Sequence, residues 1–223
     1  MAHYPQSKVI SALFKTGQPM AFGAGEMIMS NYNSLNGIYF IDSGFVKVYS
    51  IGNEGDEYIH IVYGQGELFP LVWAYLGVSE SSLFYEAMRD VLVWRISRET
   101  LSKKINSNPE LSDAVSVQLA RQLYVFSNRI ENLEYKKADE RIAYHLLFLA
   151  SRFGTRDGDS IVIEAPITHD ILADSINLVR ETVSREIEKL ATQGTIKRVN
   201  HQIIIMDVPA LEAKINNTIA FDF

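Results

Sequence analysis

The sequence contains no cysteine. Without a thiol the chain can form no disulfide, no cysteine-ligated zinc site and no iron–sulfur cluster held by cysteine. It also lacks the run of about 18 apolar residues that a membrane-spanning helix needs. Residues 1–18 have neither the continuous apolar core nor the cleavage site of a signal peptide. These absences make the cytoplasm the expected compartment.

Motifs of enzyme chemistry are missing as well. There is no P-loop, no G-x-S-x-G, no H-E-x-x-H, and no G-x-G-x-x-G at a strand-to-helix turn. Histidine is scarce, and the positions are His3, His60, His145, His169 and His201. Only His60 falls in the strand-rich part of the chain, and one imidazole supplies neither a haem-ligand pair nor the converging ligands of a cupin metal site. We therefore expect no enzyme, no cofactor and no metal. A cupin-like enzyme is the remaining alternative in that class, and metal that stays bound through purification would favour it.

The sequence also lacks an excess of positive charge. Lys and Arg number 21 against 27 Asp and Glu, which gives a formal net charge of −6. A nucleic-acid contact must therefore be a local patch and not a field over the whole molecule. The length of 223 residues and the apolar content of 47% suit one large domain or two small ones with real cores.

The first half of the chain reads as β structure. Residues 22–97 contain apolar runs such as GIYFIDSG, FVKVYSI, EYIHIVY and VLVWRIS, separated by glycines. Short strands at near-regular spacing with turn signals indicate a sandwich, roll or barrel. Asn53-Glu54-Gly55 predicts a hairpin turn between two of these strands.

The pattern becomes helical after residue 97. Residues 98–107 predict a short helix that ends before Pro109. From residue 109 to about 137, apolar side chains recur at a heptad-like spacing, at Val115, Leu119, Leu123, Phe126, Ile130 and Leu133. Because so long a helix has more apolar surface than a small roll can cover, we interpret Leu119, Leu123, Phe126 and Ile130 as a dimer seam. The alternative is a helix of the intrachain core. Residues 138–153 predict a separate helix, followed by the polar loop RFGTRDGDS and the strand SIVIEAP.

Residues 168–198 carry a helix-turn-helix pattern. Thr168 can cap the first helix, and Asn177 tolerates the left-handed backbone of a turn. The apolar positions are Ile171, Leu172 and Ile176 in the first helix, then Leu178, Val179, Val183, Ile187 and Leu190 in the second. The opposite face of the second helix carries Arg180, Glu181, Ser184 and Arg185 at the end that meets base edges in a recognition helix. Arg can fork onto guanine and Glu can accept from cytosine. The alternative is an amphipathic helix pair whose polar face is only solvated.

A winged hairpin is expected after this helix pair. Gly194 ends the second helix, and two apolar runs follow around Asn200-His201. This arrangement would bring Lys197 and Arg198 near a DNA backbone.

The second half of the chain resembles the DNA-binding end of the Crp/Fnr family of bacterial regulators, in the segments VRETVSREI and LATQGTIKR. The first half contains segments that resemble the family's β-roll and occur in the same order, FGAGEMIM, IYFIDSGFVKVYSI and YGQGELF. The resemblance implies an α+β fold with a β-roll effector domain (1–108), a dimerisation helix (109–137) and a winged helix-turn-helix (138–223). It implies a homodimer on double-stranded DNA with a TGTGA-like half-site, and RNA polymerase as a further partner. Ser184 also fits a branch that prefers TTGAT. It assigns DNA contacts to Thr168, Arg180, Glu181, Ser184, Arg185, Lys197 and Arg198. An effector-binding protein that acts only through protein contacts is the alternative from another class.

The effector site departs from the family pattern. In the cyclic-nucleotide binders of this fold, the Glu of a GEL motif takes the ribose hydroxyl, and an Arg-Ser pair holds the cyclic phosphate. Glu67 matches, but Ser81 and Ser82 occupy the Arg-Ser slot and no Arg follows until Arg89. The phosphate would lose a bidentate partner, so cyclic AMP is not expected.

The segment after GEL is also unusual, because FPLVWAYLG stands where a small helical phosphate cradle is expected. Its bulky side chains either pack in the core or line a pocket for an apolar or aromatic effector that the sequence does not identify. The candidate pocket residues are Glu67, Phe69, Trp73, Tyr75, Ser81, Ser82 and Tyr85.

Overall fold

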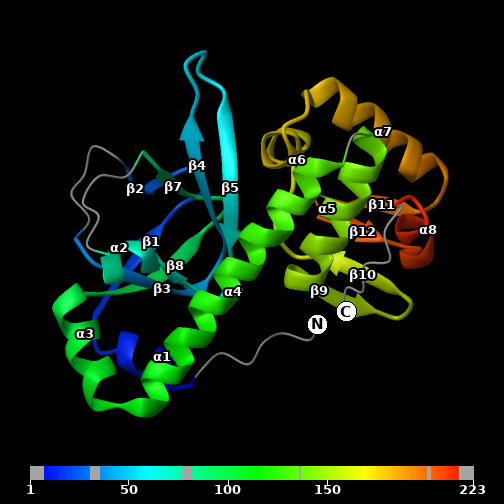
Figure 1. The fold of residues 1–223 in the computed structure, drawn as a ribbon. Coiled ribbons are helices and arrows are strands. Elements are labelled where there is room, and N and C mark those ends of the chain that lie inside the picture. Colours follow the sequence, from blue (N-terminus) through cyan, green and yellow to red (C-terminus); the bar gives the residue numbers. More distant parts are fainter. Residues whose placement is uncertain (1–7, 31–35, 77–81, 136, 200–201, 216–223) are drawn as a thin grey trace. The chain divides into compact units, whose positions relative to one another are not determined.

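The computed structural model describes residues 8–30, 36–76, 82–135, 137–199 and 202–215. The chain divides into two compact units, with the division after Phe126. Helix α4 (Pro109–Glu134) is continuous through this point (Figure 1). The first unit is mainly β structure and the second mainly helical, which confirms the predicted α+β class. No helix in the described ranges has both the length and the apolarity that a membrane crossing requires.

Two four-stranded antiparallel sheets form the roll of the first unit. One has the order β1 (Gln18–Phe22), β8 (Val91–Ile96), β3 (Ile38–Ser43), β6 (Leu68–Phe69). The other has the order β2 (Met27–Met29), β7 (Phe84–Ala87), β4 (Val46–Ile51), β5 (Glu57–Tyr63). The β4–β5 hairpin extends beyond the rest of its sheet (Figure 1). Its turn holds Gly55 at a φ of +93°, where glycine has no steric penalty, and the predicted hairpin is confirmed.

Aromatic rings fill the centre of the roll. Phe69 on β6 is fully buried, and its ring centroid lies 5.2 Å from that of Tyr39 in the same sheet. The Phe69 centroid also lies 5.7 Å from that of Tyr63 and 5.4 Å from that of Tyr85, which belong to the other sheet. Stacked rings at these separations add to the stabilisation that burial provides. Phe69 therefore joins the two sheets as a core residue.

A second core lies between helices and the sheet that contains β3. It is formed by α1 (Lys8–Phe14), α2 (Leu71–Leu76), α3 (Arg98–Ser107) and the start of α4. Helix α3 has its predicted bounds, and the Ser97 side chain caps it by accepting from the Thr100 N–H. The buried members of this core are Ile10, Phe14, Ile38, Phe40, Leu68, Leu71, Ile96, Leu101, Leu111 and Val115.

The apolar row of α4 begins in this core. Val115 belongs to the apolar row but not to the predicted seam, and it is fully buried in the second core. Leu119 of the predicted seam is half-buried and packs against this core. Periodicity could not separate the two cases, because a helix shows the same apolar spacing to a sheet and to a partner helix. The bulky segment after GEL forms the short helix α2.

Two buried glutamines tie α4 to the strand that carries the GEL segment. Gln118 Nε2 donates to the Gly66 carbonyl at 3.0 Å, and Gln122 Nε2 donates to the Leu68 carbonyl at 2.7 Å. Their spacing of four residues places both on one face of the helix. The backbone on either side of Glu67 is thereby fixed to α4.

Replacing Gln122 with Ala should lower the free energy of unfolding of the first unit by about 1–3 kcal/mol, because the buried Leu68 carbonyl loses its donor. Both tryptophans of the chain, Trp73 and Trp94, lie in this unit, so urea unfolding followed by their fluorescence reports on it alone. Ser116→Ala is the matched control, because it removes an exposed side-chain hydrogen bond from the same helix. Equal stabilities for the two variants would show that the glutamine contact contributes nothing.

The second unit is built on α5 (Ala138–Phe153), which matches the predicted range. The elements that follow are β9 (Gly154–Asp157), β10 (Ser160–Ile163), α6 (His169–Ile176), α7 (Arg180–Thr192), β11 (Ile196–Val199), β12 (Gln202–Ile205) and α8 (Val208–Glu212). The sheet has the order β11-β12-β10-β9. The expectation of a plain loop over residues 152–160 is wrong, because β9 pairs with β10 there. An edge strand with exposed side chains carries no apolar alternation in its sequence, so it was missed.

Candidate nucleic-acid interface

The helix-turn-helix is held by two local features. Thr168 caps α6, since its hydroxyl accepts from the Ile171 N–H at 3.2 Å. Asn177 follows the helix in the left-handed conformation, with φ of 53° and ψ of 55°. An asparagine adopts this conformation more readily than most residues. The structure confirms both as the cap and the turn that the sequence predicts.

Arginines from outside the motif also fix this turn. Arg129 on α4 donates to the Ser175 carbonyl at 2.6 Å, and Arg141 on α5 donates to the carbonyls of Ile176 at 3.1 Å and Asn177 at 3.3 Å. Cations suit the carbonyl end of a helix, where backbone acceptors are left without intrahelical donors. These two arginines were not predicted, because nothing in a local sequence pattern shows which carbonyls a distant side chain reaches.

The second helix begins two residues after the start of its predicted apolar stripe at Leu178. Val179 was expected to face the core, but it is the residue that precedes α7 and is 64% exposed. Its backbone is extended, so the helical period does not apply to it. The buried side chains of α7 are Val183, Ile187 and Leu190, as predicted.

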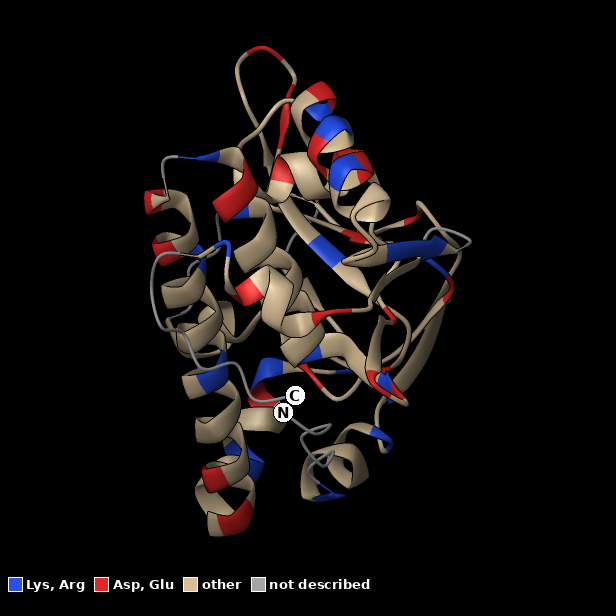
Figure 2. Cartoon of the chain, turned by 90° about the vertical axis from the view of Figure 1, so that its right-hand side faces the viewer, with Lys and Arg blue, Asp and Glu red and all other residues tan. Residues whose placement is uncertain are grey.

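The predicted base-reading residues lie in the first two turns of α7. Arg180, Glu181 and Arg185 are exposed and Ser184 is half-buried. Residues at positions i, i+1, i+4 and i+5 of a helix share a face. This face differs from the buried one, and Lys/Arg and Asp/Glu are interspersed along α7 in Figure 2. The structure therefore brings these four residues together on one accessible surface.

Both arginines of this surface have acidic neighbours. Arg180 Nη1 lies 3.3 Å from Asp170 Oδ1 on α6, and Arg185 Nε lies 3.6 Å from Glu186 Oε1. Glu186 also pairs with Lys189 at 3.5 Å. Exposed ion pairs of this kind contribute little to stability. Both guanidinium groups therefore remain accessible at the surface.

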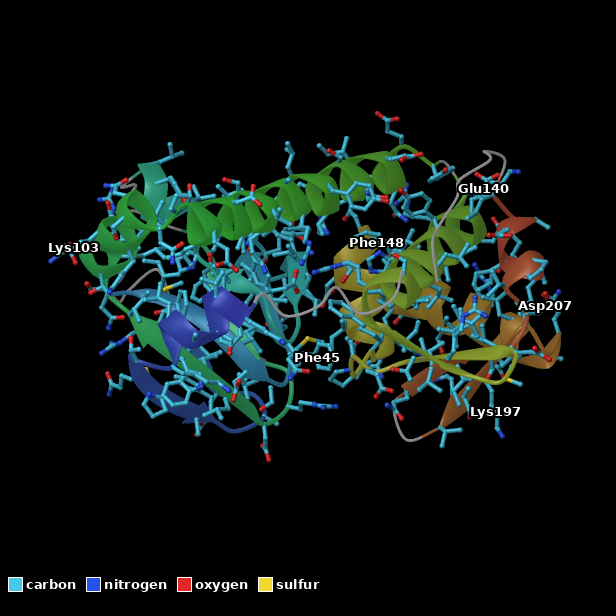
Figure 3. All side chains as sticks on the ribbon, turned by 90° about the horizontal axis from the view of Figure 1, so that it is seen from below. Phe45, Lys103, Glu140, Phe148, Lys197 and Asp207 are labelled. Atoms are coloured by element: carbon cyan, nitrogen blue, oxygen red, sulfur yellow. The ribbon has the colours of Figure 1, made fainter. Side chains whose placement is uncertain are left out.

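The hairpin β11–β12 carries the other predicted cations. Lys197 and Arg198 on β11 are exposed, and the Lys197 side chain projects away from the ribbon in Figure 3. The predicted turn at Asn200-His201 lies outside the described residues.

Arg198 contacts the start of α6 through His169. Its Nη1 lies 2.7 Å from His169 Nε2. A guanidinium only donates, so Nε2 accepts and the imidazole is neutral with its proton on Nδ1. Partial burial lowers the pKa of His169, and the charges of Arg198 and Arg180 lower it further, while Asp170 opposes them. His169 and Asp170 were missed from sequence, although their place directly after the cap of the first helix was a usable signal.

The predicted effector residues fall into separate environments within the roll. Glu67 accepts from the Gly64 N–H at 2.6 Å, so it has a structural role in the turn between β5 and β6. Phe69 and Tyr85 stack in the centre, and burial raises the pKa of the Tyr85 hydroxyl. Trp73 packs against the second core, while Tyr75 on α2 is exposed. Ser82 is exposed, and Ser81 lies outside the described residues.

A charged cluster on the sheet that contains β4 was not predicted. Lys47 Nζ lies 2.7 Å from Glu57 and 3.3 Å from Glu86, and Tyr49 donates to Glu86 at 3.2 Å. The residues come from three strands, so only the pairing of the sheet reveals them. Within the described ranges, no group of three or more histidine and carboxylate side chains could hold a metal ion.

Family models match both units of the chain. Residues 19–108 match the cyclic nucleotide-binding domain, and residues 140–214 match the Crp-like helix-turn-helix domain. The chain is 27% identical over 210 residues to a CRP-like cAMP-activated global transcriptional regulator of Mycobacterium tuberculosis, which covers 91% of this chain and 90% of the relative. It is also 27% identical over 208 residues to the nitrogen fixation regulation protein FixK of Azorhizobium caulinodans, which covers 92% of this chain and 81% of the relative.

Solved structures show the same fold. FixK2 from Bradyrhizobium japonicum matches with a TM-score of 0.76 at 22% identity, over 91% of this chain and 99% of the other. A CRP-family transcriptional regulator from Thermus thermophilus matches with a TM-score of 0.75 at 23% identity, over 91% of this chain and 98% of the other. With a roll, a long helix and a winged helix-turn-helix in this order, the chain belongs to the Crp/Fnr family of transcription regulators.

Proposed function

We propose that the protein is a homodimeric, sequence-specific regulator that reads a pseudo-palindromic DNA site with α7 of each subunit in the major groove. The observation that carries this proposal is the exposure of Arg180, Glu181 and Arg185 on one face of the first two turns of α7. These residue types read guanine and cytosine edges, and the N-terminal part of a recognition helix is the part that reaches them. Thr168, Ser184, Lys197 and Arg198 complete the proposed DNA contacts.

The proposed half-site is TGTGA-like, with its outer base pairs open to the TTGAT variant that suits Ser184. A two-fold dimer would place two copies of α7 one helical turn of DNA apart. The proposed domains are 1–108, 109–137 and 138–223, and α4 and α5 are separated between Glu134 and Ala138. RNA polymerase as a partner is proposed from the family alone.

Dimerisation is proposed through the exposed apolar side chains of α4. Leu123 is 69% exposed, Phe126 37% and Ile130 63%. Their spacings of three and four residues keep them on one face of the helix. Apolar side chains in a heptad-like row on a long helix suit a partner helix better than water.

Control by an effector other than a cyclic nucleotide is proposed for the roll. The effector would change the packing of the paired α4 helices and so the spacing of the two α7 helices, a coupling between distinct sites. The contact of Gln118 and Gln122 with the backbone around Glu67 supports this coupling, because it joins the roll directly to α4.

The first test is a search for the operator among genomic fragments by gel shift, followed by Arg185→Ala on the site found. This variant should weaken specific binding by about 1–3 kcal/mol and relax the preference at one guanine, because it loses a bidentate contact. Arg156→Ala is the matched control, since it removes an equal charge from an exposed position on β9 of the same unit.

Wild-type affinity of Arg185→Ala, with equal binding to specific and scrambled DNA, would contradict the assignment of this residue. A wild-type protein that shifts no fragment would instead favour a regulator that acts only through protein contacts.

A further inference from the structure

One ion pair crosses the helix-turn-helix at the surface proposed for DNA. Asp170 is the second residue of α6 and Arg180 is the first residue of α7, and Arg180 Nη1 lies 3.3 Å from Asp170 Oδ1. The backbone beneath both residues is held firmly, by the Thr168 cap before α6 and the left-handed Asn177 after it. The carboxylate therefore has a defined place from which to hold the guanidinium.

The pair leaves most of the guanidinium fork accessible. The ion pair joins Nη1 of Arg180 to Asp170, and the Arg180 side chain remains largely exposed. Recognition of guanine needs two parallel N–H donors aimed at O6 and N7. A long exposed side chain loses rotamer freedom when it adopts that geometry. A carboxylate that already restrains the side chain reduces this loss, as supporting contacts do in other binding sites.

We propose that Asp170 is a positioning residue for DNA reading, which orients Arg180 toward one base pair and so raises sequence selectivity. This inference rests on the proposed function, because it assumes that α7 enters the major groove. It assigns a role to a residue of the first helix that is not among the proposed DNA contacts.

The charge of Asp170 gives the proposal an unusual signature. A carboxylate at a surface that faces phosphates weakens binding to every DNA sequence, because counterion release depends on net positive contacts. Positioning of Arg180, by contrast, strengthens binding only to the matching base. Loss of the carboxylate should therefore raise the affinity for random DNA and lower the selectivity at the base pair that Arg180 reads.

Arg185 supplies an internal comparison. Its acidic neighbour, Glu186, is the next residue of the same helix and also pairs with Lys189. Its ion pair therefore lies within α7, whereas that of Arg180 crosses to α6. The base pair that Arg185 reads should consequently be unaffected by a change at Asp170.

The experiment measures binding of the full-length protein to the selected operator, to all three single-base replacements at each half-site position, and to random DNA. Arg180→Ala and Arg185→Ala first identify the position that each arginine reads. Asp170→Asn is then compared with Glu188→Gln, which removes an equal charge from an exposed position of α7. Thermal unfolding of each variant shows whether the fold is retained.

Asp170→Asn should lower the preference at the Arg180 position by roughly three- to tenfold, a part of the discrimination that one bidentate contact supplies. The preference at the Arg185 position should stay as in the wild type, and affinity for random DNA should rise as it does in Glu188→Gln. In the background of Arg180→Ala, the Asp170 change should no longer alter selectivity.

Two results would overturn the positioning role while leaving the proposed function intact. The first is that the wild-type protein is selective and the Asp170→Asn variant has the same base preferences. The other is higher selectivity at the Arg180 position in that variant, which would make the ion pair a competitor of DNA. A wild-type protein without any sequence preference would overturn the proposed function, and the role of Asp170 with it.

Discussion

A double variant in which both Leu123 and Phe126 are changed to Glu is expected to be a monomer that no longer binds its operator. Both side chains are apolar and exposed on α4, at 69% and 37%. Across a two-fold interface the double variant would bury four carboxylates without partners, and an unpaired buried charge costs several kcal/mol. The monomer would also lose the second half-site as an intramolecular contact, which is about a 10²- to 10⁴-fold loss of affinity.

Sedimentation equilibrium measures the loss of the dimer, and tryptophan fluorescence shows whether the roll stays folded. The control variant carries Ser102→Glu and Ser107→Glu, which add the same charge at exposed positions of α3. We expect the control to remain a dimer with wild-type DNA affinity. A dimer that survives the change at Leu123 and Phe126 would place the interface on another surface of the chain.

Local signals of the sequence predicted the elements that have strong ends. Helix α3 ends before Pro109, as predicted, and the structure adds the capping side chain of Ser97 at its start. Helix α6 lies between the predicted cap Thr168 and the predicted turn residue Asn177. Each of these signals acts within a few residues of the chain, so a single sequence is enough to read it.

Apolar periodicity predicted which faces are covered, but not what covers them. Val115 and Leu119 share the heptad-like row with Leu123 and Phe126, yet the first two pack in the core of the first unit. The hydrophobic effect is not directional, so the same side chains suit a sheet and a partner helix equally well. The row alone therefore could not show where the intrachain core ends and an exposed stripe begins.

Contacts between residues far apart in sequence were beyond prediction. Gln118 reaches the Gly66 carbonyl, Arg129 reaches the Ser175 carbonyl, and Arg141 reaches the turn after α6. Each is a polar side chain on a helix, where solvation is the ordinary expectation. Only the packing of elements decides which of them finds a partner, so candidate site residues on one helix were predictable and their supports were not.

Cyclic AMP and cyclic GMP are expected not to bind the roll, although one relative at 27% identity is described as cAMP-activated. The slot for the phosphate-binding Arg-Ser pair holds Ser81 and Ser82 in this chain. The nearest arginines have other contacts, since Arg89 lies over the Phe45 ring and Arg95 donates to Gln18 at 2.5 Å. A buried anion without a paired cation costs several kcal/mol, or several decades of affinity.

The centre of the roll gives a second reason. The Phe69 ring stacks with rings from both sheets, and Glu67 is already engaged with the Gly64 N–H. A purine would have to displace buried aromatic rings, and cores packed to crystal-like density resist added volume.

Calorimetry with each nucleotide measures binding to the roll directly. The positive control is the M. tuberculosis relative, titrated with cyclic AMP in the same buffer. Micromolar binding at one site per subunit would contradict both arguments. If no binding occurs, DNA binding by the ligand-free protein would favour a dimer that needs no effector. If the ligand-free protein does not bind DNA, the search turns to an apolar or aromatic ligand near Trp73, Tyr75 and Tyr85.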